Sequence, residues 1–251
     1  MNQLFIRLRY LNKYPIIVGI FLTLLISCKK ETPEPLYTKG VITGRVNINA
    51  FESDNEENKY SDIVVKAYGP YGEKSTSVSY ENYYASFKFE GLGNGTYRVS
   101  VSKKGYGTVE AYSLKIFEND TVYAGYFDLY KQNPYATVPL SIMQDEPDSQ
   151  NKSIISFTIG EHNSPLVMFL SSRPDVAYNK YQSVHVNMTS DNTKFLIYVN
   201  RMPFITGTKV YCILYPYAGE YYGYFNPKYG VKIFSSIIPS KHSTVFSFIM
   251  P

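Results

Sequence analysis

The sequence of 251 residues has no tryptophan, only two cysteines and only three histidines. His162, His185 and His242 are isolated from one another, and none has a second ligand type at the spacing of a metal site. Cys212 lies inside an apolar run, which predicts an inert core thiol. Neither a Gly-x-Ser-x-Gly motif nor a glycine-rich loop before a helix is present. These absences predict a protein that is not an enzyme and uses no metal and no cofactor.

Basic clusters are also missing. The formal net charge is +4, and Arg7, Arg9 and Lys13 supply most of it, since residues 28 to 251 hold 22 basic and 21 acidic side chains. Nucleic-acid binding requires a basic patch, so a nucleic-acid partner is not expected. The acidic run Glu52–Asn58 lacks the alternation and the glycine of a calcium loop and is predicted to be a solvated loop.

The first thirty residues have the layout of a secretion signal, in which a basic stretch precedes the apolar run Ile16–Ile26. A membrane-spanning helix needs about 20 apolar residues, and this run has roughly half of that. It ends in Leu25-Ile26-Ser27-Cys28, which resembles a lipobox. The resemblance implies cleavage before Cys28 and attachment of lipid, palmitate included, to that cysteine. The alternatives are an ordinary signal peptide with an incidental cysteine and an uncleaved N-terminal helix.

Residues 1–27 are therefore predicted to be a cleaved lipoprotein signal peptide, and residues 28–39, which contain two prolines, a tether. Two or more acyl chains hold a protein stably on a bilayer. By resemblance to enteric lipoproteins, Lys29 in place of aspartate favours the outer membrane, with the face of that membrane left open. If Cys28 carries lipid, Cys212 has no disulfide partner in the chain.

Alternating apolar and polar residues predict β-strands from Gly40 to Lys131, as in Thr96–Val101. Gly93-Asn94-Gly95 predicts a tight turn between two strands. Together with Gly44–Val46, Ile63–Val65, Phe87–Leu92, Gly95–Val99 and Lys104–Tyr106, these features resemble the carboxypeptidase regulatory-like domain, a transthyretin-like sandwich of seven strands. The segment 80–86 departs from the turn that this family has before its Phe-x-Phe strand.

Prolines and polar residues interrupt the strand pattern in 132–152, which is predicted to be a linker or first-strand region. Residues 153–251 contain seven strand-like runs separated by turn residues and are predicted to form an Ig-like sandwich. The run Gly207–Ile213 faintly resembles a fibronectin type III strand, although Val210 stands where that family has tyrosine. No sustained helical spacing follows residue 28, so the predicted fold is all-β: two tandem β-sandwiches after a cleaved signal peptide.

Tyrosine is the abundant residue of this chain, with 26 copies. Tyrosine presents a rigid apolar face with a polar tip and is enriched in recognition loops. The densest cluster supplies six candidate recognition residues, Tyr217, Tyr221, Tyr222, Tyr224, Phe225 and Tyr229. The alternative is that these aromatic rings pack in a strand and cover a hairpin.

The function expected from these features is that of a non-catalytic lipoprotein of the cell envelope. It would be held to the membrane by its N-terminal lipid and would bind a glycan, a peptide or an envelope protein complex. The alternative is a structural subunit of pilin or adhesin type, which would exchange an edge strand between copies.

Overall fold

A computed structural model describes residues 39–49, 59–81, 84–145, 153–186, 193–220 and 223–251. These residues form β-strands with one short 3-10 helix, η1 (Val199–Arg201), so the all-β prediction is confirmed. Within the described ranges no helix is long and apolar enough to cross a membrane. The predicted signal peptide, Cys28, all but the last residue of the predicted tether and the whole acidic run Glu52–Asn58 lie outside the described residues.

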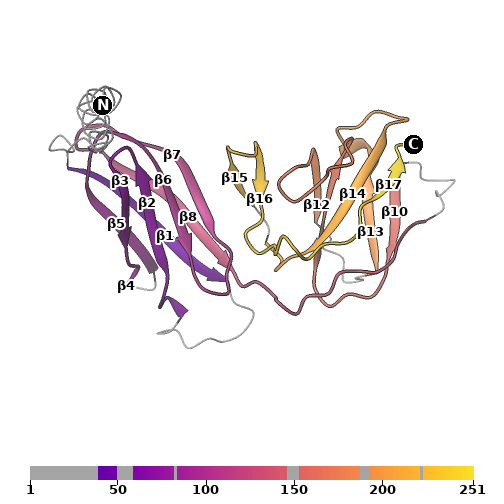
Figure 1. Cartoon of the computed structure of the whole chain (residues 1–251), viewed down its shortest axis with the longest axis horizontal. Coiled ribbons are helices and arrows are strands. Elements are labelled where there is room, and N and C mark those ends of the chain that lie inside the picture. The colour runs from indigo at the N-terminus through magenta and orange to yellow at the C-terminus, as the bar shows by residue number, and fades with distance from the viewer. Residues whose placement is uncertain (1–38, 50–58, 82–83, 146–152, 187–192, 221–222) are drawn as a thin grey trace, which may run out of the picture. The chain divides into compact units, whose positions relative to one another are not determined.

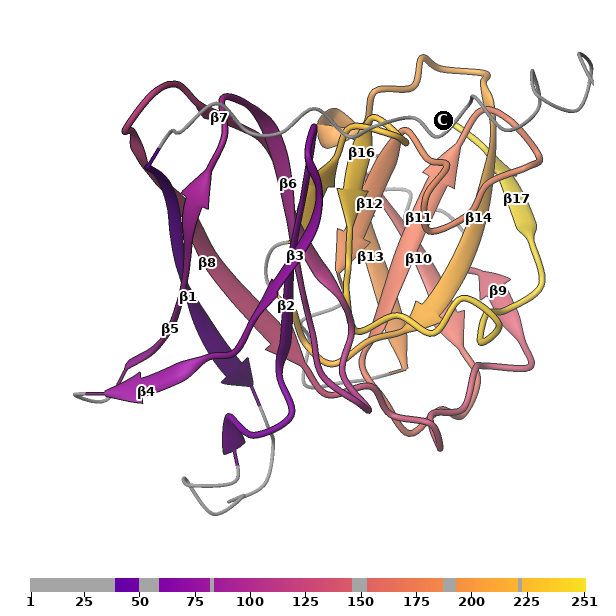
Figure 2. The ribbon, with the colours of Figure 1, turned by 60° about the vertical axis from the view of Figure 1, so that its left-hand side comes forward.

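Two four-stranded sheets form the first sandwich. One has the order β4-β5-β1-β8, the other β3-β2-β6-β7, and Figure 2 shows them as two layers. The strands are β1 (Gly40–Asn49), β2 (Val64–Gly69), β3 (Gly72–Thr76), β4 (Ser79–Glu81), β5 (Tyr84–Leu92), β6 (Gly95–Ser102), β7 (Val109–Ile116) and β8 (Thr121–Tyr130).

The alternation of side chains along these strands creates the first core. In β6, Tyr97, Val99 and Val101 are buried while their neighbours are partly exposed, as period two predicts. They pack with side chains from the facing sheet, among them Phe87 and Phe127, whose rings meet edge to face at 5.5 Å. The hydrophobic effect of joining these two apolar faces is the main stabilisation of the sandwich.

The predicted turn at Gly93-Asn94-Gly95 does not close a β-hairpin. It joins β5 to β6, and these two strands belong to opposite sheets. Glycine is needed there because a Cβ at Gly93 would lie 2.3 Å from the Tyr71 ring, and Gly95 has a φ of +154°. The Tyr97 hydroxyl donates to the Gly93 carbonyl at 2.9 Å, which fixes the connection from inside.

The second sandwich pairs a three-stranded sheet, β13-β10-β9, with a four-stranded sheet, β12-β11-β14-β17 (Figure 1). Its strands are β9 (Ile142–Gln144), β10 (Ile154–Ile159), β11 (Leu166–Ser171), β12 (Ser183–Val186), β13 (Lys194–Tyr198), β14 (Lys209–Pro216) and β17 (Phe246–Ile249). A separate hairpin consists of β15 (Tyr224–Asn226) and β16 (Val231–Ile233).

The four-stranded sheet of the second sandwich is covered on both faces. Every residue of β11 is buried, which a two-layer sandwich does not require. One face of this sheet contributes to the core between the two sheets. The other face, which carries Phe169 of β11 and Tyr215 of β14, lies under a third layer that includes Phe234. The segment after β14 and the β11–β12 loop supply this cover.

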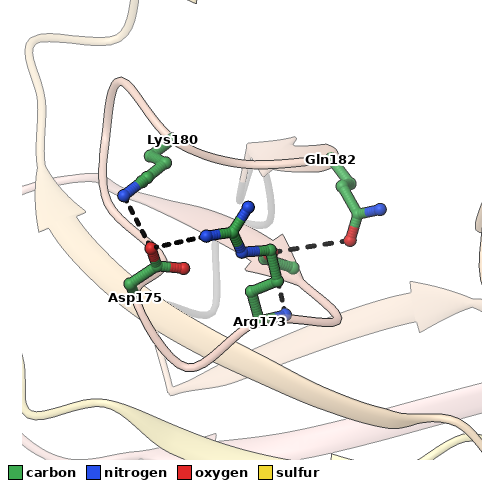
Figure 3. A network of polar contacts seen from close by, with 5 residues as sticks. Arg173, Asp175, Lys180 and Gln182 are labelled. Atoms are coloured by element: carbon green, nitrogen blue, oxygen red, sulfur yellow. Dashed lines mark hydrogen bonds and ion pairs between the residues drawn. The ribbon is translucent and has the colours of Figure 1, made fainter.

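The β11–β12 loop is closed by polar contacts (Figure 3). Asp175 accepts from Lys180 at 2.6 Å and from Arg173 at 3.2 Å, and the hydrogen bond from Lys180 is the main reason why the pKa of Asp175 is lowered. Gln182 Oε1 accepts from the Ser172 amide at 2.6 Å. This closure holds the Tyr181 ring 4.8 Å from Phe169.

The observed strands also differ from the predicted runs. Two of the strand-like runs end later than the strands they contain. The run predicted for 194–200 turns into η1 after Tyr198, and the run predicted for 231–237 ends as a strand at Ile233. β9 lies in the region 132–152, which was predicted to be a linker or first-strand region. β15 was not predicted as a strand, since three residues are too few to show a period. In the first sandwich β4 occupies part of the segment that departs from the family pattern.

Candidate functional site

The predicted recognition segment does not form one exposed loop. Tyr217 is only 6% exposed, and its ring meets Phe234 edge to face at 6.5 Å in the third layer. Tyr221 and Tyr222 lie outside the described residues. Tyr224 is half-buried in β15 and packs against the core of the first sandwich. Burial accounts for most of the rise in the pKa of Tyr224.

Phe225 and Tyr229 are the exposed members of that segment, at 59% and 40%. The neighbouring Asn226 is buried and donates through Nδ2 to the Tyr112 hydroxyl at 3.0 Å. Four of the six aromatic residues are thus described, two of them engaged in packing and two accessible. A binding role for the segment stays a prediction.

Glu220, just before the undescribed pair, is a buried carboxylate that is 2% exposed. Oε1 accepts from the amide and hydroxyl of Ser235 at 3.2 and 3.3 Å, and Oε2 accepts from the same two groups of Ser236 at 3.2 and 3.3 Å. Burial raises the pKa of Glu220 to about 7, against the lowering effect of these donors. The group ties the chain after β14 to the segment after β16.

Two further residues singled out in the sequence, Cys212 and His185, are structural. Cys212 is fully buried in β14, and burial raises the pKa of its thiol far above the usual range, so the thiolate that reacts with electrophiles is disfavoured. His185 lies near Met202 Sδ at 3.1 Å, and burial lowers its pKa. Among the described residues no group of three His, Cys, Asp or Glu side chains could hold a metal ion.

The outer face of β1 and β8 carries a group of accessible aromatic and polar side chains. Tyr123 and Tyr126 are 50% and 60% exposed, and their rings meet edge to face at 5.8 Å. Arg45 lies beside them, with its guanidinium carbon 5.9 Å from the centre of the Tyr126 ring. We call Arg45, Asn47, Tyr123, Tyr126 and Asp128 the tyrosine platform.

A β-bulge brings the two tyrosines to one face. Strands β1 and β8 run parallel, with Thr43 opposite Tyr123 and Arg45 opposite Tyr126, so β8 uses three residues where β1 uses two. In a regular strand, positions three apart point to opposite faces. The extra residue reverses this, and Gly125, with a φ of +104°, adopts the backbone conformation that the bulge needs.

The inner side of the bulge is adapted to the core. A Cβ on Gly44 would lie 2.4 Å from Cζ of Phe87, so the phenylalanine ring packs directly beneath the bulge only because residue 44 is glycine. After the bulge the alternation resumes, with Phe127 and Leu129 buried. The platform is therefore supported by a close-packed layer rather than by a mobile loop.

Polar groups surround the tyrosine rings. Asn47 Nδ2 donates to Asp128 Oδ1 at 2.9 Å, and Arg45 Nη1 lies 3.5 Å from the Tyr126 hydroxyl. Burial, followed by the hydrogen bond with Tyr126, raises the pKa of Tyr123. An apolar ring face next to donors and acceptors suits a ligand that has both C–H faces and hydroxyl groups.

Sequence reasoning missed the platform because it searched for dense clusters of tyrosine. Tyr123 and Tyr126 stand in a strand, and their spacing in a regular strand places them on opposite faces. The available signal was the Ala124-Gly125 pair between them, since a glycine inside a strand pattern suggests a bulge.

No protein-family model matches the sequence, and no curated protein is significantly similar to it. Among solved structures, a candidate carbohydrate binding protein from Bacteroides uniformis is 11% identical, with 84% of this chain and 99% of that chain covered and a TM-score of 0.28. A DUF3823 family protein from Bacteroides ovatus is 11% identical over 85% and 100% of the two chains, with a TM-score of 0.26. A two-domain fibronectin type III segment of chicken tenascin is 12% identical over 76% and 84%, with a TM-score of 0.23. Scores this low establish neither a shared fold nor a shared function.

Proposed function

We propose that this chain is a non-catalytic, lipid-anchored binding module of the bacterial cell envelope, and that it binds a glycan on the tyrosine platform. The observation that carries the proposal is the exposed pair Tyr123 and Tyr126, supported from below and flanked by Arg45 and by the hydrogen-bonded pair Asn47 and Asp128. Neither ring belongs to a hydrophobic core cluster of the described residues.

The chemistry of the platform favours a saccharide over an apolar peptide. A pyranose ring has a face of C–H bonds, which packs on the negative face of an aromatic ring, and a rim of hydroxyl groups that both donate and accept. Arg45 and Asn47 supply donors, and Asp128 supplies acceptors beside the rings. A flat apolar partner would remove the charged groups of Arg45 and Asp128 from water and would offer them no hydrogen bonds in return.

The edge position of β8 bears on the alternative of a strand-exchanging subunit. β8 is the last strand of its sheet, and the bulge interrupts its regular backbone. Bulged edges are poor templates for the addition of a further strand. The platform therefore supports side-chain recognition better than strand addition at this edge.

The glycan test uses the full-length chain in detergent on an array of bacterial envelope and host polysaccharides. The double variant Tyr123→Ala/Tyr126→Ala should lose about 1–3 kcal/mol of binding free energy, on the order of a tenfold to hundredfold weaker affinity. Tyr198→Ala is the matched control, because Tyr198 is a 42% exposed strand tyrosine with a guanidinium 4.9 Å from its ring. Absence of binding to every polysaccharide, or equal binding by the double variant, would refute the proposal.

The anchor is tested separately at Cys28, which the lipobox resemblance marks as the lipidated residue. In cells labelled with palmitate, the wild-type chain should carry the label and fractionate with the outer membrane. Cys28→Ser should remain unprocessed and unlabelled, whereas Cys212→Ser, the control for the second cysteine, should be labelled as the wild type is. Efficient labelling of Cys28→Ser would show that the anchor is wrong.

A further inference from the structure

The second sandwich contains an open cleft of 1110 Å³, and none of its lining residues belongs to the tyrosine platform. Its walls come from the chain before β9, from the end of β10 with the residues that follow it, and from Ser240–His242 before β17. The apolar part of the lining includes Val138, Leu140 and Ile159, and Leu140 is fully exposed. The polar part includes two histidines and a glutamate.

Both histidines of the cleft are held in the same tautomer. His162 Nδ1 lies 2.9 Å from the Gly160 carbonyl, and His242 Nδ1 lies 2.8 Å from the Ser243 carbonyl. A carbonyl can only accept, so Nδ1 carries the proton in each neutral ring, and Nε2 is left as an acceptor. The Glu161 carboxylate adds further acceptors and has no protein partner among the described residues.

One wall of the cleft is fixed by hydrogen bonds. Asn163 Oδ1 accepts from the Thr137 amide at 2.8 Å and from its hydroxyl at 3.1 Å, and Asn163 Nδ2 donates to the Tyr135 carbonyl at 3.1 Å. Lys241 Nζ donates to the carbonyls of Pro134 and Ala136. These hydrogen bonds leave one N–H of the Lys241 ammonium group and one N–H of the Asn163 amide unused. The cleft thus presents acceptors, a few donors and an apolar wall in a preorganised frame.

We infer that this cleft is a second saccharide subsite, which takes the hydroxyl rim of a pyranoside against the Nε2 atoms of His162 and His242 and the carboxylate of Glu161. Hydroxyl groups donate to these acceptors and accept from Lys241, while the C–H face of the sugar covers Val138 and Leu140. A primary ammonium would also suit the acceptors, but it would lie near the Lys241 charge. The inference rests on the proposed function for its ligand class, and its site is independent of the tyrosine platform.

The test is nuclear magnetic resonance of the imidazole nitrogens in the full-length chain in detergent. Long-range ¹H–¹⁵N spectra at a pH at which the rings are neutral should show protonated Nδ1 and unprotonated Nε2 for His162 and His242. The probes are methyl glycosides of glucose, galactose, mannose and N-acetylglucosamine at millimolar concentration. At least one of them should shift both Nε2 signals, with saturation.

The variants His162→Phe and His242→Phe retain an aromatic ring and remove the acceptor, and each should weaken that titration about tenfold. The double variant Tyr123→Ala/Tyr126→Ala should leave this titration unchanged. The experiments therefore distinguish a failure of the platform proposal from a failure of the cleft proposal. The opposite tautomers, no shift with any glycoside, or a shift with ethanolamine alone would overturn the inference. If a phenylalanine variant does not fold, the spectra of the unmodified chain decide.

Discussion

Glu220 makes the stability of the second sandwich depend on pH in a direction opposite to that of most carboxylates. Its side chain is buried, and both carboxylate oxygens accept hydrogen bonds from Ser235 and Ser236. Burial raises its pKa to about 7. Because the folded state holds this proton more tightly than the unfolded chain does, stability should fall as pH rises from the unfolded to the folded pKa.

The magnitude follows from the two pKa values. The pKa rises from the usual 4.5 to about 7 on folding, which at 1.36 kcal/mol per pH unit is about 3 kcal/mol. This stabilisation of the protonated form is present below about pH 4.5 and is lost as the pH passes through about 7. Glu220→Gln has no proton to lose. Its single carbonyl oxygen can satisfy only one of the two serine amides, so below about pH 4.5 the variant should be about 1–3 kcal/mol less stable than the wild type, and this difference should shrink or reverse as the wild type loses its stabilisation at higher pH.

The assay is urea denaturation of both chains at a series of pH values, followed by tyrosine fluorescence because the chain has no tryptophan. Between about pH 4 and about pH 8 the free energy of unfolding of the wild type should fall by about 3 kcal/mol relative to Glu220→Gln, since all other groups cancel in the difference. Over the same range the protection factors of the Ser235 and Ser236 amides, which correct for the base-catalysed exchange of any free amide, should fall in the wild type and stay constant in Glu220→Gln. Parallel stability curves for the two chains would refute the reasoning.

Three further predictions concern the core and the bulge. Gly125→Ala should destabilise the first sandwich by about 1–2 kcal/mol. The added methyl group has room, but alanine is strained at the φ of +104° that residue 125 adopts. A urea midpoint equal to that of the wild type would show that the backbone is not strained there. Phe169→Ala should cost about 3–5 kcal/mol, because the ring is fully buried among Tyr181, Tyr215 and Phe234, while Leu196→Ala, at 42% exposure, should cost far less. Cys212 should react with a maleimide only after denaturation, and rapid labelling of the native chain would show that the thiol is accessible.

The strands that alternate regularly could be predicted from the sequence. β6 and β10 follow period two: Tyr97, Val99 and Val101 are buried in β6, and Ile155, Phe157 and Ile159 in β10. β11 was also predicted, from its continuous apolar run, but that run could not show what covers its second face. The third layer is built from segments distant in the chain, the β11–β12 loop and the residues around Phe234, and local periodicity contains no information about such contacts.

The prediction of a recognition segment was limited for the same reason, because residues close together in the sequence do not show what distant segments cover. The density of tyrosine between residues 217 and 229 is a property of the sequence, but burial separates Tyr217 from Phe225 and Tyr229. Clustering along the chain says little about exposure, because a tyrosine serves a core and a surface equally well. The exposed pair at Tyr123 and Tyr126 lies where no cluster exists.

The sequence by itself determined the all-β class, the buried state of Cys212 and the prediction of an anchor at Cys28, since each depends on residues close together in the chain. Only the tertiary structure decided which aromatic rings are accessible. A one-residue bulge at Gly125 turns Tyr126 to the face of Tyr123, and the burial of Glu220 changes the protonation of its carboxyl group. Both effects depend on the partner strand or on the surrounding layer, and neighbouring residues in the sequence do not specify them.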